Sequence, residues 1–134
     1  MADFWYDHVH IVGSDPQATA QWFVDKFRGE LKSVWIAPNG VAHIIVVLNG
    51  ANILVKGRSE EPTVQSHPPG STYGLEHFAL QTNDLDDAMA ELQEKGVSVV
   101  QGITKIRSGA RNAFIAGPDN TLIELIERSG VLQD

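Results

Sequence analysis

Hydrophobic and polar positions repeat in two similar halves of the chain. Near the N-terminus the stretch YDHVHIV alternates as a strand does, and Asp15-Pro16 then has the form of a helix cap with proline at the first helical position. Past the middle, GLEHFAL alternates in the same way, Asp84 caps a second helical pattern, and Gly96 ends it. His8 precedes Asp15 by the same distance as His77 precedes Asp84, and the two histidines lie 69 positions apart, about half of the 134 residues. This spacing predicts an internal duplication.

Each helical pattern is followed by three strand-like runs separated by turn residues. Asn49-Gly50 is a strong signal for a tight hairpin. The predicted strands are Leu31–Ile36, Val41–Leu48 and Asn52–Lys56 in the first half, and Val97–Ile103, Asn112–Ala116 and Leu122–Glu127 in the second. Both halves therefore read as strand, helix, strand, strand, strand, which predicts an α+β fold of two βαβββ modules.

These modules are predicted to form one domain over residues 1–134. Module one covers about 4–57 and module two about 75–128. The segment 58–74 between them contains Pro62, Pro68, Pro69 and Gly70, a composition typical of a linker.

Composition narrows the class of protein. Hydrophobic residues make up 43% of the chain, enough for a sizeable core, and the absence of cysteine excludes disulfides and thiolate metal sites. A net charge of -7 without a dense Lys/Arg run argues against nucleic acid or membrane as the partner. The longest apolar run, Val41–Leu48, is too short to cross a bilayer, and Met1–Phe4 lacks the start of a signal peptide. We expect a cytoplasmic protein with a small-molecule partner.

Three side chains are candidate metal ligands. Aligning Asn49-Gly50 with Asp119-Asn120 makes Leu54 the repeat partner of Glu124, the only carboxylate inside the last apolar strand. Glu124 then points away from the face of its apolar neighbours. If the modules pair around a pseudo-twofold axis, His8, His77 and Glu124 converge.

Two imidazoles and one carboxylate suit Fe²⁺ or Mn²⁺, with Zn²⁺, Ni²⁺ or Co²⁺ as alternatives. Taken singly, a strand histidine is more often a hydrogen-bonded structural residue, and a strand glutamate more often belongs to an ion pair. The duplicated spacing favours the joint assignment.

The stretches DHVHIVGSDPQATAQWFVDKF, LEHFALQTNDLDDAMAELQEKG and AFIAGPDNTLIELIE resemble the vicinal oxygen chelate proteins, also called the glyoxalase/bleomycin-resistance/dioxygenase superfamily. The resemblance covers about Asp7 to Glu127. It implies two βαβββ modules that form a cupped mixed sheet around a metal, with ligand positions at His8, His77 and Glu124. We also expect a homodimer. Modules in this superfamily pair either within one chain or across two, and the sequence does not distinguish these arrangements.

Departures from the family pattern bear on the reaction. The fourth ligand position is Leu54, which cannot accept a proton, so glyoxalase- or epimerase-like lyase and isomerase chemistry is disfavoured. Extradiol dioxygenases use three ligands, but Phe114 stands where their tyrosine is expected. A fosfomycin-type thiol transferase and a non-catalytic drug-binding or resistance protein remain alternatives.

Other side chains are assigned to the substrate and to proton transfer. The extradiol dioxygenase pattern also has a histidine ahead of the closing turn, and this chain has none there. The acid–base residue is therefore expected to be His10 or His43, with His67 in the linker as a further alternative. For His10 a packing role is an equal alternative, and for His43 the role of a hydrogen-bonded core histidine is the favoured one. The predicted substrate-binding residues are Arg111, Phe114, Leu54 and Trp5, of which Arg111 matches the geometry of an anionic group.

Overall fold

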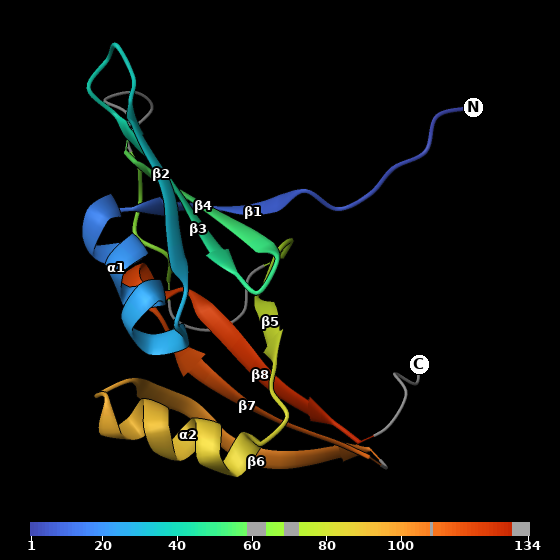
Figure 1. Ribbon diagram of the computed structural model, residues 1–134. Helices are drawn as coiled ribbons and strands as arrows, with labels where there is room; N and C mark the ends of the chain where they lie inside the picture. The colour runs from blue at the N-terminus through green and yellow to red at the C-terminus, as the bar shows by residue number, and fades with distance from the viewer. Residues whose placement is uncertain (59–63, 69–72, 108, 130–134) are drawn as a thin grey trace. The chain divides into compact units, whose positions relative to one another are not determined.

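The computed structural model describes residues 1–58, 64–68, 73–107 and 109–129. They fall into two compact units, Met1–Gln65 and Ser66–Asp134 (Figure 1). The first unit contains β1 (His8–Gly13), α1 (Pro16–Phe27), β2 (Glu30–Ile36), β3 (Ala42–Leu48) and β4 (Ala51–Gly57). The second contains β5 (Phe78–Gln81), α2 (Leu85–Glu94), β6 (Ser98–Arg107), β7 (Ala110–Ala116), a 3₁₀ turn (Pro118–Asn120) and β8 (Leu122–Arg128). The predicted order of strand, helix and three strands is confirmed in both.

The two sheets have the same topology. Their strand orders are β1-β4-β3-β2 and β5-β8-β7-β6. In each, the first strand pairs parallel with the last, and the remaining pairs are antiparallel. Each helix provides the crossover that the parallel arrangement requires. The predicted fold of two βαβββ modules is thus confirmed.

Both helices begin at the predicted aspartates. The Asp15 carboxylate accepts a hydrogen bond from the Ala18 backbone N–H at 3.1 Å, and Asp84 accepts one from Asp87 N–H at 3.0 Å. Gly96 follows α2 at φ +81°, a conformation that glycine adopts at little cost. The sequence therefore encodes the ends of these helices locally.

The core of each unit lies between its helix and one face of its sheet. In unit 1, Phe23 of α1 is fully buried with alternate residues of β3 and β4, including Ile44, Val46 and Val55. In unit 2, α2 buries Leu85, Met89 and Leu92. Alternate residues of β7 and β8 are buried as well: Ala113, Ile115, Ile123 and Leu125. The intervening strand positions, including His43, Leu54 and Glu124, are only partly buried. Alternation therefore places the candidate site residues on the sheet faces away from the helices.

Several strand boundaries differ from the predictions. β5 begins at Phe78, so His77 lies just before the strand and not within it. β6 continues to Arg107 rather than Ile103, and β7 begins at Ala110 rather than Asn112. The extra residues are mostly charged or polar, so no apolar alternation marked them as strand. The linker prediction falls partly on residues 59–63 and 69–72, which lie outside the described residues. No helix in the part of the chain that the structure describes is long and apolar enough to cross a membrane.

Replacing Phe23 with alanine should lower the free energy of unfolding by about 3–5 kcal/mol, because the ring is fully buried and its removal leaves a cavity. Urea unfolding followed by circular dichroism measures this loss. Gln21→Ala, an exposed position two residues earlier on α1, is the matched control and should change stability by less than about 0.5 kcal/mol. Equal effects of the two substitutions would contradict the assigned core.

Candidate functional site

His77 and Glu124 meet on the sheet face of unit 2. His77 lies directly before β5, and Glu124 lies in β8 opposite Ala79. The Nε2 atom of His77 is 3.1 Å from Oε1 of Glu124, and the Glu124 side chain is only 14% exposed. The parallel pairing of β5 with β8 thus brings together two residues that are 47 positions apart.

The same imidazole contacts a second carboxylate. Nδ1 of His77 lies 3.0 Å from Oε1 of Glu76. If Nδ1 carries the proton of a neutral ring, Nε2 and the Glu124 oxygen face each other with lone pairs, so a proton or a cation must stand between them. Two cis ligand atoms each about 2.1 Å from a metal ion lie about 3 Å apart, close to the observed separation. These two side chains therefore fit as part of a metal-binding set.

Two residues of β7 surround this pair. The Asn112 amide Nδ2 donates a hydrogen bond of 2.9 Å to Oε2 of Glu124. The edge of the Phe114 ring meets the His77 ring, with centroids 5.0 Å apart and planes at 88°. The sequence analysis identified Phe114 but missed Asn112, because the contact depends on the register between β7 and β8.

His8 in unit 1 has the same local arrangement as His77. Its Nδ1 lies 2.6 Å from Oδ2 of Asp7, the residue before it. Such a carboxylate contact fixes the tautomer of a ligating histidine and leaves Nε2 for a metal. The acidic residue before each histidine is a signal in the sequence that could have been used.

The register confirms the predicted repeat relationship of Leu54 and Glu124. Leu54 of β4 pairs with His10 of β1, as Glu124 pairs with Ala79. The corresponding positions therefore carry one carboxylate in unit 2 and none in unit 1.

His10 and His43 lie on the same side of the unit 1 sheet. The His8 and His10 ring centroids are 5.7 Å apart. Burial lowers the pKa of the His10 imidazole, and the nearby charges of Lys56, His8 and His43 lower it further. His43 pairs with Lys56 across the sheet, and its ring lies 5.2 Å from that of Trp35. The two candidate acid–base residues therefore share one electropositive environment.

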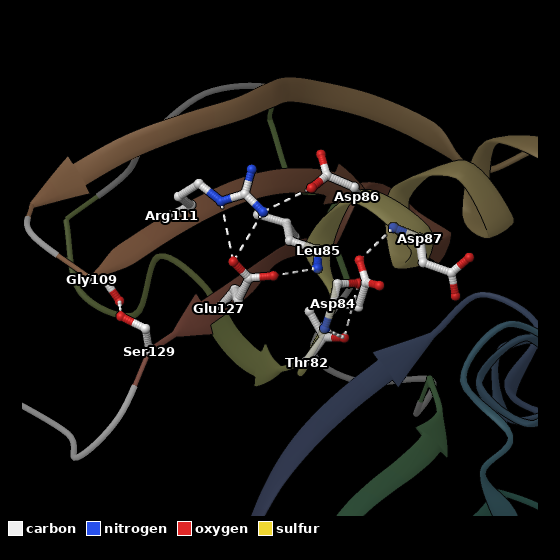
Figure 2. Close-up of polar contacts among 9 residues, drawn as sticks. All are labelled: Thr82, Asp84, Leu85, Asp86, Asp87, Gly109, Arg111, Glu127 and Ser129. Carbon is white, nitrogen blue, oxygen red and sulfur yellow. Dashed lines mark hydrogen bonds and ion pairs between the residues drawn. The ribbon is translucent and has the colours of Figure 1, made fainter.

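Arg111 lies on the other side of its sheet. It alternates with Asn112 along β7, and its guanidinium binds Oε1 of Glu127 and Oδ2 of Asp86, each at 3.0 Å (Figure 2). Glu127 also accepts the Leu85 backbone N–H at 2.8 Å, so this cluster supports the start of α2. The structure accounts for Arg111 through this role and does not bring it to Glu124. Its substrate contact stays a prediction that these bonds do not support.

The remaining predicted residues are dispersed. Trp5 is 84% exposed and lies outside any helix or strand. His67 is exposed, with Nδ1 near the Pro68 carbonyl oxygen. Among the described residues, no group of three or more His, Asp or Glu side chains is arranged to hold a metal ion. The structure thus brings together His77, Glu124 and Phe114 in unit 2, and His8, His10 and Leu54 in unit 1.

Comparison with known proteins gives consistent results. A model of the Glyoxalase/Bleomycin resistance protein/Dioxygenase superfamily matches residues 5–125. The Bacillus subtilis (strain 168) protein YwkD is 27% identical over 90% of this chain and 94% of its own. The structure of TnmS3, an antibiotic binding protein from Streptomyces sp. CB03234, is 29% identical with a TM-score of 0.70, covering 96% of this chain and 99% of that one. A glyoxalase family protein from Enterococcus faecalis is similar in fold, with 24% identity and a TM-score of 0.76 over 92% of this chain and 97% of that one.

The Glu127 cluster predicts a pH-dependent contribution to stability. The Leu85 N–H and then Arg111 hold the pKa of the Glu127 carboxyl below its ordinary value of 4.5. A lowered folded-state pKa gives stability that is present above the unfolded-state pKa and is lost as pH falls through the folded-state value. Glu127→Gln should therefore destabilise the protein at pH 7, and the gap from the wild type should narrow below about pH 4.5.

Urea unfolding of both proteins between pH 7 and pH 3 measures this effect. Glu94→Gln, on the exposed end of α2, is the control and should show a much smaller gap at either pH. A gap for Glu127→Gln that is constant across the range would show that the carboxylate charge contributes nothing.

Proposed function

The chain belongs to the Glyoxalase/Bleomycin resistance protein/Dioxygenase superfamily, and from this premise we propose that it is an enzyme that uses one divalent metal ion. The proposed ligands are His8, His77 and Glu124. The observation that carries the proposal is the 3.1 Å contact between His77 Nε2 and Glu124 Oε1. The His77 imidazole also contacts Glu76, and the Glu124 carboxylate also accepts a hydrogen bond from Asn112. These additional contacts preorganise the two side chains as a pair of metal ligands.

Two neutral nitrogens and one hard oxygen favour Fe²⁺ or Mn²⁺. When bound, such an ion polarises oxygen atoms of a substrate and stabilises the negative charge that develops on them. The chain's own residues hold the donors in place. Glu76 and Asp7 fix the two imidazoles through Nδ1, and Asn112 fixes Glu124.

The proposed substrate is a small molecule with two neighbouring oxygen atoms. Phe114 offers an apolar surface beside His77, and Leu54 offers one beside His10. Because Leu54 is neither a ligand nor a base, three protein ligands leave up to three octahedral positions open. This favours an extradiol-dioxygenase-like reaction, in which a catechol and dioxygen would both occupy open coordination positions.

A lyase or isomerase reaction is the alternative within the enzyme class. It needs a proton acceptor that is not a ligand, and His10 and His43 are the imidazoles available beside Leu54. Their cluster with Lys56 would also favour an anionic substrate, since an ammonium group and imidazole N–H groups all donate hydrogen bonds.

A binding protein without catalysis is the second candidate. The 29% identity with TnmS3, described as an antibiotic binding protein, favours it. Such a protein would bind its drug without requiring a metal. Bleomycin added to protein in EDTA, followed by tryptophan fluorescence, tests this candidate, because Trp35 lies beside His43. Saturable quenching in EDTA would favour drug binding.

We predict that His77→Ala removes the metal. Protein loaded with Fe²⁺ or Mn²⁺ without oxygen, then desalted, should hold close to one ion per chain for the wild type and less than about a tenth of that for the variant, because the imidazole is a primary ligand. Elemental analysis measures the ratio. His67→Ala, an exposed histidine in the same unit, is the matched control and should retain the metal.

A panel of catechols added with oxygen then separates the reaction classes. A yellow ring-fission product formed by the wild type and not by His77→Ala supports the dioxygenase. Full metal retention by His77→Ala would contradict the site. A wild type that binds none of Fe²⁺, Mn²⁺, Co²⁺, Ni²⁺ or Zn²⁺ would favour the binding protein.

A further inference from the structure

Asn112 is a buried amide with only one end satisfied. It lies in the middle of β7 and is 6% exposed, and Thr19 is the other buried polar residue among those described. Its Nδ2 donates to Glu124 Oε2 at 2.9 Å, whereas Oδ1 is buried and has no hydrogen-bond partner within the described part of the chain. The orientation of the amide is fixed, because a carboxylate only accepts and so must face the NH₂ group.

The fold gains little from an amide at this position. A buried acceptor without a donor destabilises the folded state relative to an apolar side chain of the same size. Ala113 follows it, and its cross-strand partners are Ile126 on β8 and Thr104 on β6. The Thr104 hydroxyl donates to the Gly102 carbonyl oxygen at 3.3 Å and so does not satisfy Oδ1 of the amide. The equivalent position in unit 1 is His43, which pairs with Lys56 as Asn112 pairs with Ile126, so the architecture itself accepts a different residue.

The contact with Glu124 gives the amide a role. A glutamate side chain turns about its terminal bonds, and its carboxylate has two equivalent oxygens. Asn112 binds Oε2 and leaves Oε1 as the atom that faces His77 Nε2. The Phe114 ring, which neighbours Asn112 by alternation on the same face, in turn packs against the His77 ring.

We propose that Asn112 is a positioning residue of the metal site: it fixes the Glu124 carboxylate so that one oxygen is presented beside His77, at a cost in stability that the unpaired Oδ1 reveals. This inference rests on the proposed metal-dependent function. It assigns to Asn112 an effect on metal affinity and ligand geometry that is separate from folding. Stability given up at one buried position in return for preorganised ligands is expected at a functional site.

The test compares Asn112→Leu with the wild type and two further variants. Leucine keeps the approximate size of the side chain and removes both the donor and the unpaired acceptor. Metal-free Asn112→Leu in EDTA should melt at the same temperature as the wild type or higher. Its dissociation constant for Mn²⁺, measured from the electron paramagnetic resonance signal of free Mn²⁺, should rise about 10–100-fold, the range typical for partners of metal ligands.

Thr19→Val is the matched control, since Thr19 is equally buried but belongs to α1. It should leave the Mn²⁺ dissociation constant within about twofold of the wild type, whatever its melting temperature. The visible absorption spectrum of the Co²⁺-loaded protein gives a second readout. The spectrum should change in Asn112→Leu and not in Thr19→Val, because a substitution that affects only stability does not alter the orientation of the Glu124 ligand.

The outcomes separate this inference from the proposed function. Wild type that binds Mn²⁺, with His77→Ala that does not, supports the function; if Asn112→Leu then binds within twofold of the wild type with an unchanged Co²⁺ spectrum, the role of Asn112 alone is overturned. An equal loss of affinity in Thr19→Val would also overturn it, since destabilisation would explain both. Wild type that binds none of Fe²⁺, Mn²⁺, Co²⁺, Ni²⁺ or Zn²⁺ overturns the function and, with it, the role assigned to Asn112.

Discussion

The parallel pairing of the first and last strands of each unit is the constraint on which the candidate site depends. A helix must carry the chain back across the sheet before the second strand of the pair can form. In unit 2 this pairing brings His77 against Glu124, although the two residues lie far apart in the sequence. In unit 1 the same pairing brings His10 against Leu54. In each unit, the pairing of these two strands therefore determines which candidate site residues lie side by side.

Duplication of the architecture has not kept the two sites alike. Both units retain a histidine whose Nδ1 contacts the preceding carboxylate, but only unit 2 adds Glu124 and the Asn112 amide that holds it. Unit 1 has Leu54 and His43 at the corresponding positions. This division gives one half of the protein an anionic donor and the other half basic groups beside an apolar side chain.

Much of the fold could be predicted from the sequence because its signals are local. Asp15 and Asp84 cap helices through their own side chains, and Asn49-Gly50 turns at the positive φ angles that such a dipeptide adopts. The repeat relation of Leu54 and Glu124 followed from aligning two turns. The resemblance to the superfamily, drawn from three stretches of the sequence, is confirmed.

The roles of Asn112 and Arg111 could not be predicted in the same way. Each depends on a partner whose position is fixed only when strands pair in register. For Arg111, no local pattern indicates that Glu127 and Asp86 lie beside it, and its guanidinium was therefore predicted to bind an anionic group of the substrate. Alternation with Asn112 places it on the helix side instead. The metal ligands themselves stay predictions from spacing and resemblance.

The bond from the Leu85 backbone to Glu127 also bears on how unit 2 assembles. A helix usually completes its first turn with neighbouring side chains, but α2 receives one of its acceptors from β8, 42 positions later in the chain. Until the last strand has emerged during synthesis, water and not Glu127 accepts the hydrogen bond of this N–H group. Formation of that strand would therefore complete the sheet and the helix together, which makes the acquisition of structure in this half a late and cooperative event.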